Sequence, residues 1–389
     1  MKNKKILVIE ASSLLAGSQK VTLKILDSLS QRGFEIYAIL KSDNELFDGY
    51  YKKFNTSRFV FNKIINKYFG TGDFSLSRLK VSSKIILLFS ILFSNIQVIC
   101  LAKKNNISTI YCYDPKGIVL CGLFAKLFNI KVIWHLHGKL TFGERVNKFL
   151  LRLAYKVIVP SESISNNLAH LRNDLNVVYN GFDFSLKNKS KSFQSDKKYK
   201  LIYIGTIVPN KGLHLIINKL IRSTIKEEIE LNVLGLPVGD IGDNYKKYLL
   251  DCINNLPSNI SVNFKGWVNN PTEYILNSNA LLFSSVDECE IEFNGKRNIY
   301  KASEGLPTVL IESISLGVPV LAANTTGVAE IVFSEKFGVI LDDICNCDFD
   351  LALRDTLKCQ GFKPPSEFFE KFSINTMNDK INNIIKGHI

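Results

Sequence analysis

The chain has 389 residues, which is enough for two domains of ordinary size or three small ones. Hydrophobic residues make up 46% and charged residues 22%, values that suit a folded soluble protein with a sizeable core. Eight cysteines are scattered without a CxxC pair or a Cys/His cluster at zinc spacing. This spacing excludes a zinc module of the usual kind and indicates thiols in a reducing compartment.

Charge is distributed unevenly along the chain. Residues 1–200 carry 32 Lys and Arg against 13 Asp and Glu, whereas residues 201–389 carry 17 against 23. The excess is greatest in residues 51–160, with 18 basic residues against 3 acidic ones. Such a surface favours anions: nucleic acid, acidic lipid headgroups or phosphorylated substrates. We therefore expect the N-terminal half to meet an anionic partner.

The first predicted element is a buried strand at 5–11. Its basic tip and apolar run look like a signal peptide, but Glu10 interrupts the run and no clear small-residue cleavage site follows. A helix from about Ser18 to Arg32 comes next, with Gly33 at the place of a C-cap. Further short strands, separated by helical stretches, are expected at 34–40, 108–114, 131–138 and 156–161. This β-α-β series predicts a mostly parallel sheet with helices on both faces.

Residues 85–102 form an uncharged run with the length of a marginal transmembrane helix. Ser90, Ser94, Asn95 and Gln97 dilute it. We expect a buried or half-buried helix of a large domain. A helix that lies against a membrane surface is the alternative that the composition leaves open.

Residues 186–200 are polar, basic and without aliphatic periodicity, which predicts an interdomain linker. The series of strands and helices then starts again. The expected strands lie at 201–205, 229–235, 260–268, 280–285, 319–324 and 338–343. The expected helices lie at 213–221 and 245–256, with one or two more at 365–386.

The fold class is therefore α/β, with two Rossmann-like parallel-sheet domains at 1–185 and 201–370. A C-terminal helix at 371–389 follows, and the sequence leaves open whether it crosses back to the N-terminal domain. Ligands of α/β sheets bind outside the carboxyl ends of the strands. The cleft that two such sheets face is the default active site.

The loop YIGTIVPNKG carries the first candidate site residue of the second half. A strand ends at Gly205, and Lys211 with Gly212 opens the next helix. A lysine at the carboxyl end of a strand is placed to neutralise a phosphate. The GxxxxGK[ST] spacing of a Walker A loop is absent. From this loop alone, an ordinary solvated lysine explains the pattern equally well.

Two acids bracket an apolar run in ASEGLPTVLIES. Pro307 suits the first position of a helix, Gly305 lets the backbone approach a ligand, and free N–H groups near Thr308 form an anion site. Glu304 lies on the loop side of this anion site and Glu312 lies further along the helix. Each acid can accept hydrogen bonds from hydroxyls attached to the anion. A diphosphate with ribose on one side and hexose on the other describes a nucleotide sugar.

Here the chain resembles a known family. SEGLPTVLIESISLGVPVLAANTTGVAEIV looks like the Glu-x7-Glu signature of the family 4 retaining glycosyltransferases, which have the GT-B fold. KGLHLI is similar to their phosphate-binding lysine loop, and VVYNGFD to the element before their linker. WHLHG is similar to their strand ending in His-Gly, and AGSQKVTLKILDSLSQRGFEI to their first glycine loop, helix and second strand. The resemblance covers much of the chain and implies an enzyme of the bacterial surface-polysaccharide type.

The resemblance implies catalytic roles for three residues. Lys211 would bind the donor diphosphate, Glu304 would contact the donor sugar, and His137 would lie near the reacting sugar. His135 and His137 alternate along the predicted strand and point to one face, and His137 beside the strand end is the stronger candidate. Considered alone, either histidine is explained equally well as a satisfied core residue.

The resemblance also implies a donor-binding set. Glu312 would hold the ribose hydroxyls, and Gly17 would let the N-terminal loop approach the donor. The nucleotide base would lie near the segment after Gly266. The other donor-binding residues are Thr206, Lys211, Trp267, Val268, Gly305, Leu306, Pro307 and Thr308.

Two features depart from the family pattern. Thr206 stands where the family often has an arginine, which removes one certain cation from the diphosphate site. In addition, residues 286–302 intervene where the family passes quickly to the Glu-Gly-x-Pro block. Asn294 and Gly295 predict a small hairpin beside the cleft, with an unknown effect on substrate choice.

The resemblance implies transfer with retention from a nucleotide diphosphate sugar, a UDP-sugar before a GDP-sugar, to a hydroxyl of a glycan or lipid-linked glycan. We expect same-face attack in which the leaving phosphate helps to deprotonate the acceptor, with no metal and no other cofactor. The process would be polysaccharide or lipopolysaccharide assembly. The basic N-terminal half would receive the acceptor, in the cytoplasm or on the inner face of the cell membrane, at an anionic lipid surface.

Three other functions were compared with sugar transfer. A catalytically weak nucleotide-sugar-binding module remains open because of Thr206. A Rossmann oxidoreductase is disfavoured because no GxGxxG follows the first strand. Nucleic-acid binding is not expected, because no strand interleaves aromatic with basic residues on one face.

Overall fold

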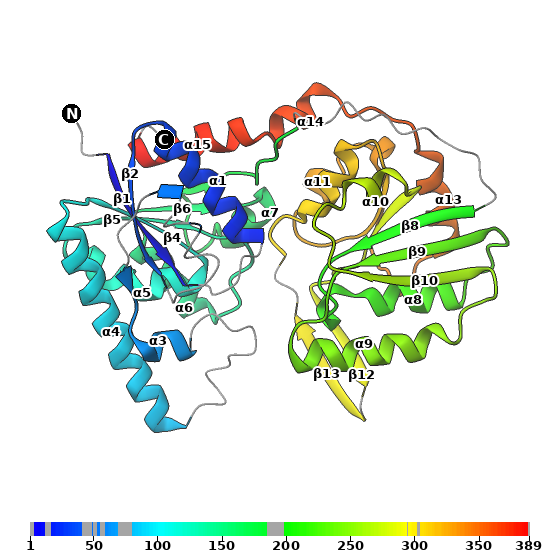
Figure 1. Cartoon of the computed structure of the whole chain (residues 1–389), viewed down its shortest axis with the longest axis horizontal. Coiled ribbons are helices and arrows are strands. Elements are labelled where there is room, and N and C mark those ends of the chain that lie inside the picture. The colour runs from blue at the N-terminus through cyan, green and yellow to red at the C-terminus, as the bar shows by residue number, and fades with distance from the viewer. Residues whose placement is uncertain are drawn as a thin grey trace. The chain divides into compact units, whose positions relative to one another are not determined.

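We describe the protein from a computed structural model (Figure 1). The structure describes residues 4–11, 17–40, 49, 53–54, 59–68, 80–184, 198–293, 295–301 and 304–387. The chain divides into two compact units. Unit 1 consists of Met1–Gly181 with Ile374–Ile389, and unit 2 consists of Phe182–Ser373.

Unit 1 is built on one parallel sheet. Its seven strands pair in the order β3-β2-β1-β4-β5-β6-β7. They are β1 (Lys5–Glu10), β2 (Glu35–Leu40), β3 (Phe59–Val60), β4 (Thr109–Tyr113), β5 (Lys131–His135), β6 (Lys156–Val159) and β7 (Leu175–Val177). The predicted parallel sheet is therefore present.

Helices cover both faces of this sheet (Figure 1). They are α1 (Gly17–Gln31), α3 (Lys63–Tyr68), α4 (Val81–Lys104), α5 (Asp114–Leu127), α6 (Glu144–Leu153), α7 (Glu162–Leu168) and α15 (Ile374–Lys386). Alternate residues of β1 enter two separate cores. Leu7 and Ile9 pack with α4, α5 and α6, whereas Ile6 and Val8 pack with α1 and α15. A strand buried on both faces explains the nearly continuous apolar run at the start of the chain.

The last helix belongs to unit 1. Met377, Ile381 and Ile384 of α15 are buried in the same core as Ile25 and Leu26 of α1. α15 lies beside α1 in Figure 1, and Arg32 donates a hydrogen bond to Asp379 between them. The chain therefore returns to its first unit after completing the second.

The segment predicted as a linker begins outside the described residues, since 185–197 are not among them. Its last three residues are strand rather than linker: β8 runs Lys198–Ile204, and Lys198 pairs with Glu228. The reason is the pairing of residues 198–200 with β9, beside which the Lys198 ammonium forms an ion pair with Glu230 at 2.8 Å. The predicted C-terminal helix is likewise divided, with residue 371 in unit 2 and α15 in unit 1.

Unit 2 repeats the plan with six parallel strands in the order β10-β9-β8-β11-β14-β15. Besides β8 these are β9 (Glu228–Leu234), β10 (Ile260–Gly266), β11 (Ala280–Phe283), β14 (Val320–Ala323) and β15 (Gly338–Leu341). Its helices are α8 (Leu213–Ile221), α9 (Gly239–Ile253), α10 (Thr272–Leu276), α11 (Thr308–Ser315), α12 (Val328–Ile331), α13 (Phe349–Lys358) and α14 (Ser366–Lys371). Short 3-10 turns lie at Pro209–Lys211 and Glu335–Phe337.

The predicted hairpin is present in unit 2. β12 (Glu288–Phe293) pairs antiparallel with β13 (Lys296–Lys301). Gly295 of the turn has a φ of +65°, as a two-residue hairpin loop requires, while Asn294 lies outside the described residues. The hairpin packs on the 3-10 turn that carries Lys211, where the Cys289 thiol lies 3.4 Å from a backbone carbonyl.

The packing of α15 gives a first prediction. Ile381→Ala should lower the free energy of unfolding by about 2–4 kcal/mol, because the side chain is fully buried and its loss leaves a cavity. Urea unfolding followed by circular dichroism measures this change. Asn383→Ala, on the exposed side of the same helix, is the control and should change little. Equal stability of the two variants would contradict the docking of α15.

Candidate functional site

The strand orders give each sheet a topological switch point. In unit 2 the chain runs from β8 outward to β9 and β10, then returns to β11 on the other side of β8. In unit 1 it runs from β1 to β2 and β3, then returns to β4. Ligands of such sheets bind outside the carboxyl ends of the strands at this point. The loops after β8 and β11, and those after β1 and β4, are therefore the candidate site loops.

Lys211 lies in the loop after β8, at the end of a 3-10 turn. Gly212 follows with a φ of +69°, and a Cβ there would lie 2.0 Å from the Ser284 carbonyl oxygen. Only glycine fits, so the lysine loop packs directly on the loop after β11. The Lys211 carbonyl accepts hydrogen bonds from the Ser284 hydroxyl at 3.0 Å and the Tyr203 hydroxyl at 3.3 Å. The backbone of the lysine is therefore fixed.

The Lys211 ammonium forms an ion pair with the Glu304 carboxylate. The lysine side chain is 30% exposed and the glutamate 13%, so water screens this pair less than a surface pair. The Glu304 charge adds to burial in raising the pKa of the adjacent Tyr203 hydroxyl, with burial as the larger cause. The structure thus brings two of the three predicted catalytic residues into contact.

The loop after Glu304 leads into α11. Pro307 was predicted at the first helical position, and this is wrong by one residue: its ψ of 93° is extended, so it caps the helix and Thr308 begins it. The backbone N–H groups at this end have no preceding turn to bond to, which is what an anion site needs. Gly305 and Pro307 are buried, whereas Thr308 and Glu312 are half-buried. The two acids therefore lie on either side of the helix start, in accordance with the sequence.

Further residues that the sequence analysis missed support this loop. A Cβ at Gly327, whose φ is +81°, would lie 2.9 Å from the Gly305 carbonyl oxygen. The Thr325 hydroxyl donates to the Asp287 carboxylate at 2.6 Å, which joins the loop after β14 to the start of the hairpin. The Asn-Thr-Thr-Gly sequence at 324–327, directly after β14, is the pattern from which this turn could have been predicted.

The other predicted donor-binding residues of unit 2 follow the same strand ends. Thr206 is exposed after β8, and Trp267 and Val268 follow β10. The Trp267 side chain is 62% exposed, and its indole N–H donates to the Asn269 side chain at 2.9 Å. These residues, Lys211 and the start of α11 share the carboxyl edge of the second sheet.

In unit 1 the switch point carries a buried acid that the sequence analysis used only as a break in an apolar run. Glu10, at the end of β1, accepts a hydrogen bond from the Tyr113 hydroxyl at the end of β4. Gln19 donates to the same hydroxyl at 3.4 Å. Gly17 begins α1, and a Cβ there would meet no atom of the described residues within 4 Å.

His137 lies two residues beyond the end of β5, so the expectation of a longer strand is wrong. β5 ends at His135 because its pairing with β6 ends there. His135 shares a hydrogen bond of 2.6 Å with the Tyr111 hydroxyl, which ties it into the core. Both ring nitrogens of His137 are buried without a hydrogen-bond partner among the described residues. Burial lowers the pKa of His137 to about 4, so the ring is neutral near pH 7.

A cavity of about 300 Å³ lies at the switch point of unit 1, and the sequence analysis did not find it. Asp114 in its wall has a φ of +55°, and burial raises the pKa of this carboxyl to about 6. Burial also lowers the pKa of the Lys116 ammonium, which the Asp114 charge opposes. The cavity is lined by Ala11, Gln19, Tyr113, Asp114, Pro115, Lys116 and Phe142.

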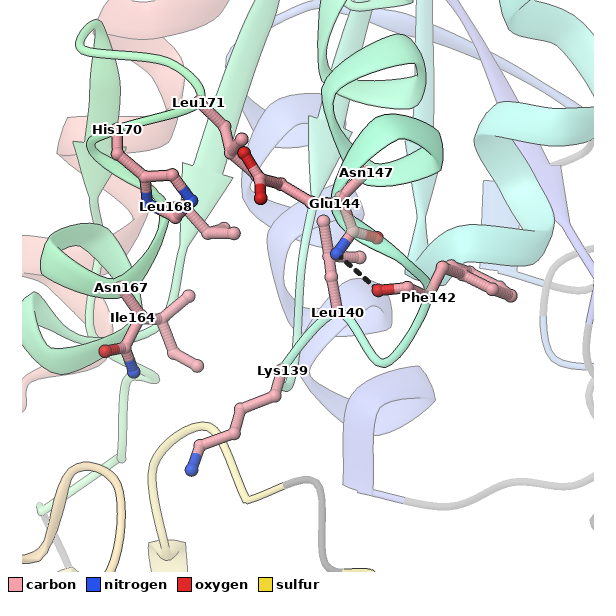
Figure 2. Close-up of a pocket in the computed structure, with 10 residues that line it drawn as sticks. All are labelled: Lys139, Leu140, Phe142, Glu144, Asn147, Ile164, Asn167, Leu168, His170 and Leu171. Atoms are coloured by element: carbon pink, nitrogen blue, oxygen red, sulfur yellow. Dashed lines mark hydrogen bonds between the residues drawn. The ribbon is translucent and has the colours of Figure 1, made fainter.

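A second pocket of about 310 Å³ lies between the loop after β5, the start of α6 and the end of α7 (Figure 2). Its wall combines charged and amide groups with aliphatic side chains. The Asn147 amide donates to the Phe142 carbonyl at 2.9 Å, the dashed line in Figure 2. The lining residues are Lys139, Leu140, Phe142, Glu144, Asn147, Ile164, Asn167, Leu168, His170 and Leu171. Such a mixed wall suits a sugar ring, which has polar edges and apolar faces.

Within the described part of the chain, no three His, Cys, Asp or Glu side chains gather as a metal site would require. The absence of a metal requirement stays a prediction.

Two family descriptions match the chain. "Glycosyltransferase Family 4" matches residues 15–186, and "Glycosyl transferases group 1" matches residues 185–375. Together they cover residues 15–375, which include the strands of both sheets except β1, so the chain belongs to the glycosyltransferases and has their α/β GT-B fold.

Curated relatives are similar over part of their length. "Capsular polysaccharide biosynthesis glycosyltransferase CapH" of Staphylococcus aureus is 26% identical over 241 residues, which is 58% of this chain. The match spans 61% of that relative, less than two thirds of it. CapM of the same organism, with the same description, is 25% identical over 284 residues, 66% of this chain and 69% of CapM.

Solved structures are similar over nearly the whole chain. Anabaena Alr3699/HepE in complex with UDP and glucose has a TM-score of 0.70 at 19% identity, covering 98% of this chain and 99% of that one. The apo lipopolysaccharide outer core galactosyltransferase WaaB has a TM-score of 0.71 at 18% identity, covering 99% and 100%. At these identities the likeness establishes the fold alone.

The buried histidine gives a prediction about acid stability. The pKa of His137 is about 4 in the folded chain and about 6.5 when unfolded, so between these values the unfolded chain binds a proton that the folded ring does not. Stability therefore falls as the pH falls through this window. The substitution His137→Asn removes this contribution. Between pH 7 and 4.5 the free energy of unfolding of this variant should fall by about 2 kcal/mol less than that of the unaltered protein.

Urea unfolding at the two pH values measures this difference. His170→Asn, at an exposed histidine, is the matched control and should behave as the unaltered protein. Identical losses for His137→Asn and the unaltered protein would contradict the buried neutral state of His137.

Proposed function

We propose that the protein transfers a sugar from a nucleotide diphosphate sugar to a hydroxyl of a glycan or lipid-linked glycan, with retention of configuration. The observation that carries this proposal is the contact of Lys211 with Glu304 beside the start of α11. A cation, a helix start and two acids at one sheet edge provide for a diphosphate with hydroxyl-bearing groups on both sides.

The donor is proposed to be a UDP-sugar, with a GDP-sugar as the second choice. The structural neighbour HepE was solved with UDP and with UDP-glucose, and this supports the preference without extending beyond that protein. CapH and CapM are described as capsular polysaccharide glycosyltransferases, and WaaB as a lipopolysaccharide galactosyltransferase. These descriptions support a role in surface polysaccharide or lipopolysaccharide assembly.

In the proposed mechanism Lys211 and the amides from Gly305 to Thr308 stabilise the charge that develops on the departing diphosphate. When the diphosphate binds the Lys211 ammonium, Glu304 loses its ion-pair partner. Its carboxylate can then accept hydrogen bonds from hydroxyls of the donor sugar. Glu312 holds the ribose hydroxyls. Trp267, Val268 and Thr206 bind the nucleotide portion, and Gly17 stays a predicted donor-binding residue.

The chemical step breaks the bond between the anomeric carbon and the phosphate oxygen and forms a bond from that carbon to the acceptor oxygen. Attack occurs on the face that the diphosphate leaves, and the acceptor proton passes to the leaving phosphate oxygen. His137 lies near the reacting sugar as a neutral hydrogen-bonding group, because its pKa of about 4 prevents protonation near pH 7. Metal and other cofactors have no part in the proposal.

The acceptor is proposed to bind unit 1. The pocket of Figure 2 offers Lys139 and His170 beside aliphatic side chains, and the switch-point cavity offers Asp114 and Lys116. Both the charge and the mixed polarity suit a glycan attached to a lipid pyrophosphate. We therefore also propose that the enzyme acts in the cytoplasm or on the inner face of the cell membrane, where such an acceptor would be available.

A catalytically weak nucleotide-sugar-binding module is the second candidate, and Thr206 favours it. This side chain is exposed in the loop after β8, and it provides no positive charge where related enzymes often have an arginine. Binding without turnover would distinguish this candidate from the first.

A panel of nucleotide sugars tests the activity. The purified full-length chain should release nucleotide faster from UDP-sugars than from GDP-sugars, and addition of EDTA should leave the rate unchanged. NMR of the first sugar released by donor hydrolysis should show the anomeric configuration of the donor. Donor binding without release, for every sugar and with glycan acceptors added, would favour the binding module instead.

Replacement of the lysine tests the phosphate role. Lys211→Ala should lower kcat about 100- to 1000-fold, because one electrostatic donor to the departing charge is lost. Lys247→Ala, at an exposed lysine of α9, is the matched control and should keep full activity. Full activity of Lys211→Ala would refute the role of this residue.

A further inference from the structure

The long helix α4 buries polar side chains in its middle, where Ser90, Ser94 and Asn95 lie, while large apolar side chains such as Phe89 and Phe93 are exposed. In a helix on the surface of a soluble domain the apolar face packs on the core. α4 packs on α3 and α5 in unit 1, and 44% of its most apolar stretch is buried. Among the helices of the described ranges, it alone is long and apolar enough to cross a membrane.

The buried face of α4 carries hydrogen-bonded polar side chains. Ser94 is fully buried, and its hydroxyl donates to the Ser90 carbonyl at 2.8 Å. Asn95 is 1% exposed, and its amide donates to the Val119 carbonyl of α5 at 3.0 Å. The Phe124 N–H of α5 donates to the carbonyl oxygen of the same amide at 3.4 Å. The polar side chains on the buried face of α4 therefore form hydrogen bonds within the helix and with α5.

The outer face carries seven large apolar side chains, each between 45% and 72% exposed. At about 100° per residue they occupy an arc of roughly 160° on one side of the helix. We call this surface the α4 face; its residues are Val81, Ile85, Ile86, Leu88, Phe89, Phe93 and Ile96.

Neighbouring elements extend the α4 face. A groove of about 470 Å³ runs between α3 and α4, with Ile64, Phe89 and Phe93 in its wall. At the other end of the helix, Leu127 at the end of α5 is 71% exposed, and Phe128 directly after it is 49% exposed. Contiguous apolar surface of this kind marks a contact with another apolar body.

The charges that residues 80–104 carry all have one sign. Lys80 and Lys84 lie at its start, Lys103 and Lys104 at its end, and all four are exposed. Lys103 lies over the Phe128 ring, 4.1 Å from its centroid. Residues 80–104 contain no Asp or Glu. The occupant of this face must therefore be apolar in the middle and negative at its edge.

We propose that the α4 face docks this protein on the interface of an anionic lipid bilayer. A bilayer offers acyl chains to the phenylalanines and acidic headgroups to the lysines at both ends of the helix. A second copy of the chain would bring these lysines against their own counterparts and leave like charges opposed. The proposal does not depend on the sugar-transfer activity.

The helix lies in the interface and does not span the bilayer. Its 24 residues would measure about 36 Å, which is long enough to cross. However, Val98, Ile99 and Ala102 are buried in the core of unit 1. Immersion of the whole helix would require this core to open, whereas lying flat exposes only the α4 face to lipid.

Vesicle flotation of the purified full-length protein tests the proposal. Binding is expected to vesicles of phosphatidylcholine with phosphatidylglycerol, and to weaken in high salt and on phosphatidylcholine alone. The double variant Phe89→Ser with Phe93→Ser should bind at least about tenfold more weakly, because two apolar anchors are lost. Lys84→Ala should weaken binding about fivefold, through charge alone.

Leu250→Ser with Leu351→Ser, at exposed leucines on helices of unit 2, is the matched control and should bind as the unaltered protein. Thermal melting checks that each variant is folded. Donor hydrolysis in solution should be unchanged in the phenylalanine variant, which separates this proposal from the catalytic one. The variant Phe93→Trp gives a direct test of insertion into lipid. If the α4 face enters the bilayer interface, brominated lipids should quench the fluorescence of the introduced indole.

Three outcomes would overturn the proposal. The first is absence of binding to acidic vesicles at low salt. The second is equal binding by the phenylalanine variant and the control. The third is a dimer in light scattering that the phenylalanine changes abolish without any vesicle binding, which would assign the α4 face to a second copy.

Discussion

The ion pair between Lys211 and Glu304 is the contact on which the candidate site of unit 2 depends. It joins the loop after β8 to the loop before α11, across 93 residues of sequence. An unpaired charge in so shielded a place is costly, so each residue stabilises the other while the site holds no ligand. Two glycines make this possible: Gly212 lets the lysine turn lie on the loop after β11, and Gly327 lets the glutamate loop lie on the turn after β14. The charges are therefore positioned by backbone packing.

Unit 1 uses the same strand-end geometry for different chemistry. Its switch point holds Glu10 and Tyr113 in hydrogen-bond contact, and the nearby His137 is neutral with both ring nitrogens buried. The sheet edge of unit 2 thus provides a cation and a helix start, and that of unit 1 provides a neutral histidine together with pockets of about 300 Å³ whose walls mix charged, amide and apolar side chains.

The α4 face shows how composition and packing carry different information. The uncharged run at 85–102 was identified from its length, but its serines and asparagine could equally have diluted a surface helix. Contacts with α3 and α5 decide the matter, because Ser94 and Asn95 turn toward the protein and Phe89 and Phe93 turn away from it. An acceptor attached to a lipid would be presented at the same surface on which this face is proposed to rest.

The sequence by itself determined the alternation of strands and helices, the hairpin at 286–302 and the places of Lys211, Glu304 and Glu312. These follow from local patterns: buried strands are continuous apolar runs, and Asn-Gly predicts a two-residue turn. Only the tertiary structure decided the order of the strands, the return of α15 to unit 1, and the closeness of Tyr113 to Glu10. The tertiary structure also decided the extended ψ of Pro307 and the end of β5 before His137. Each depends on which distant segment supplies a hydrogen bond or a packing surface, and no local pattern records that partner.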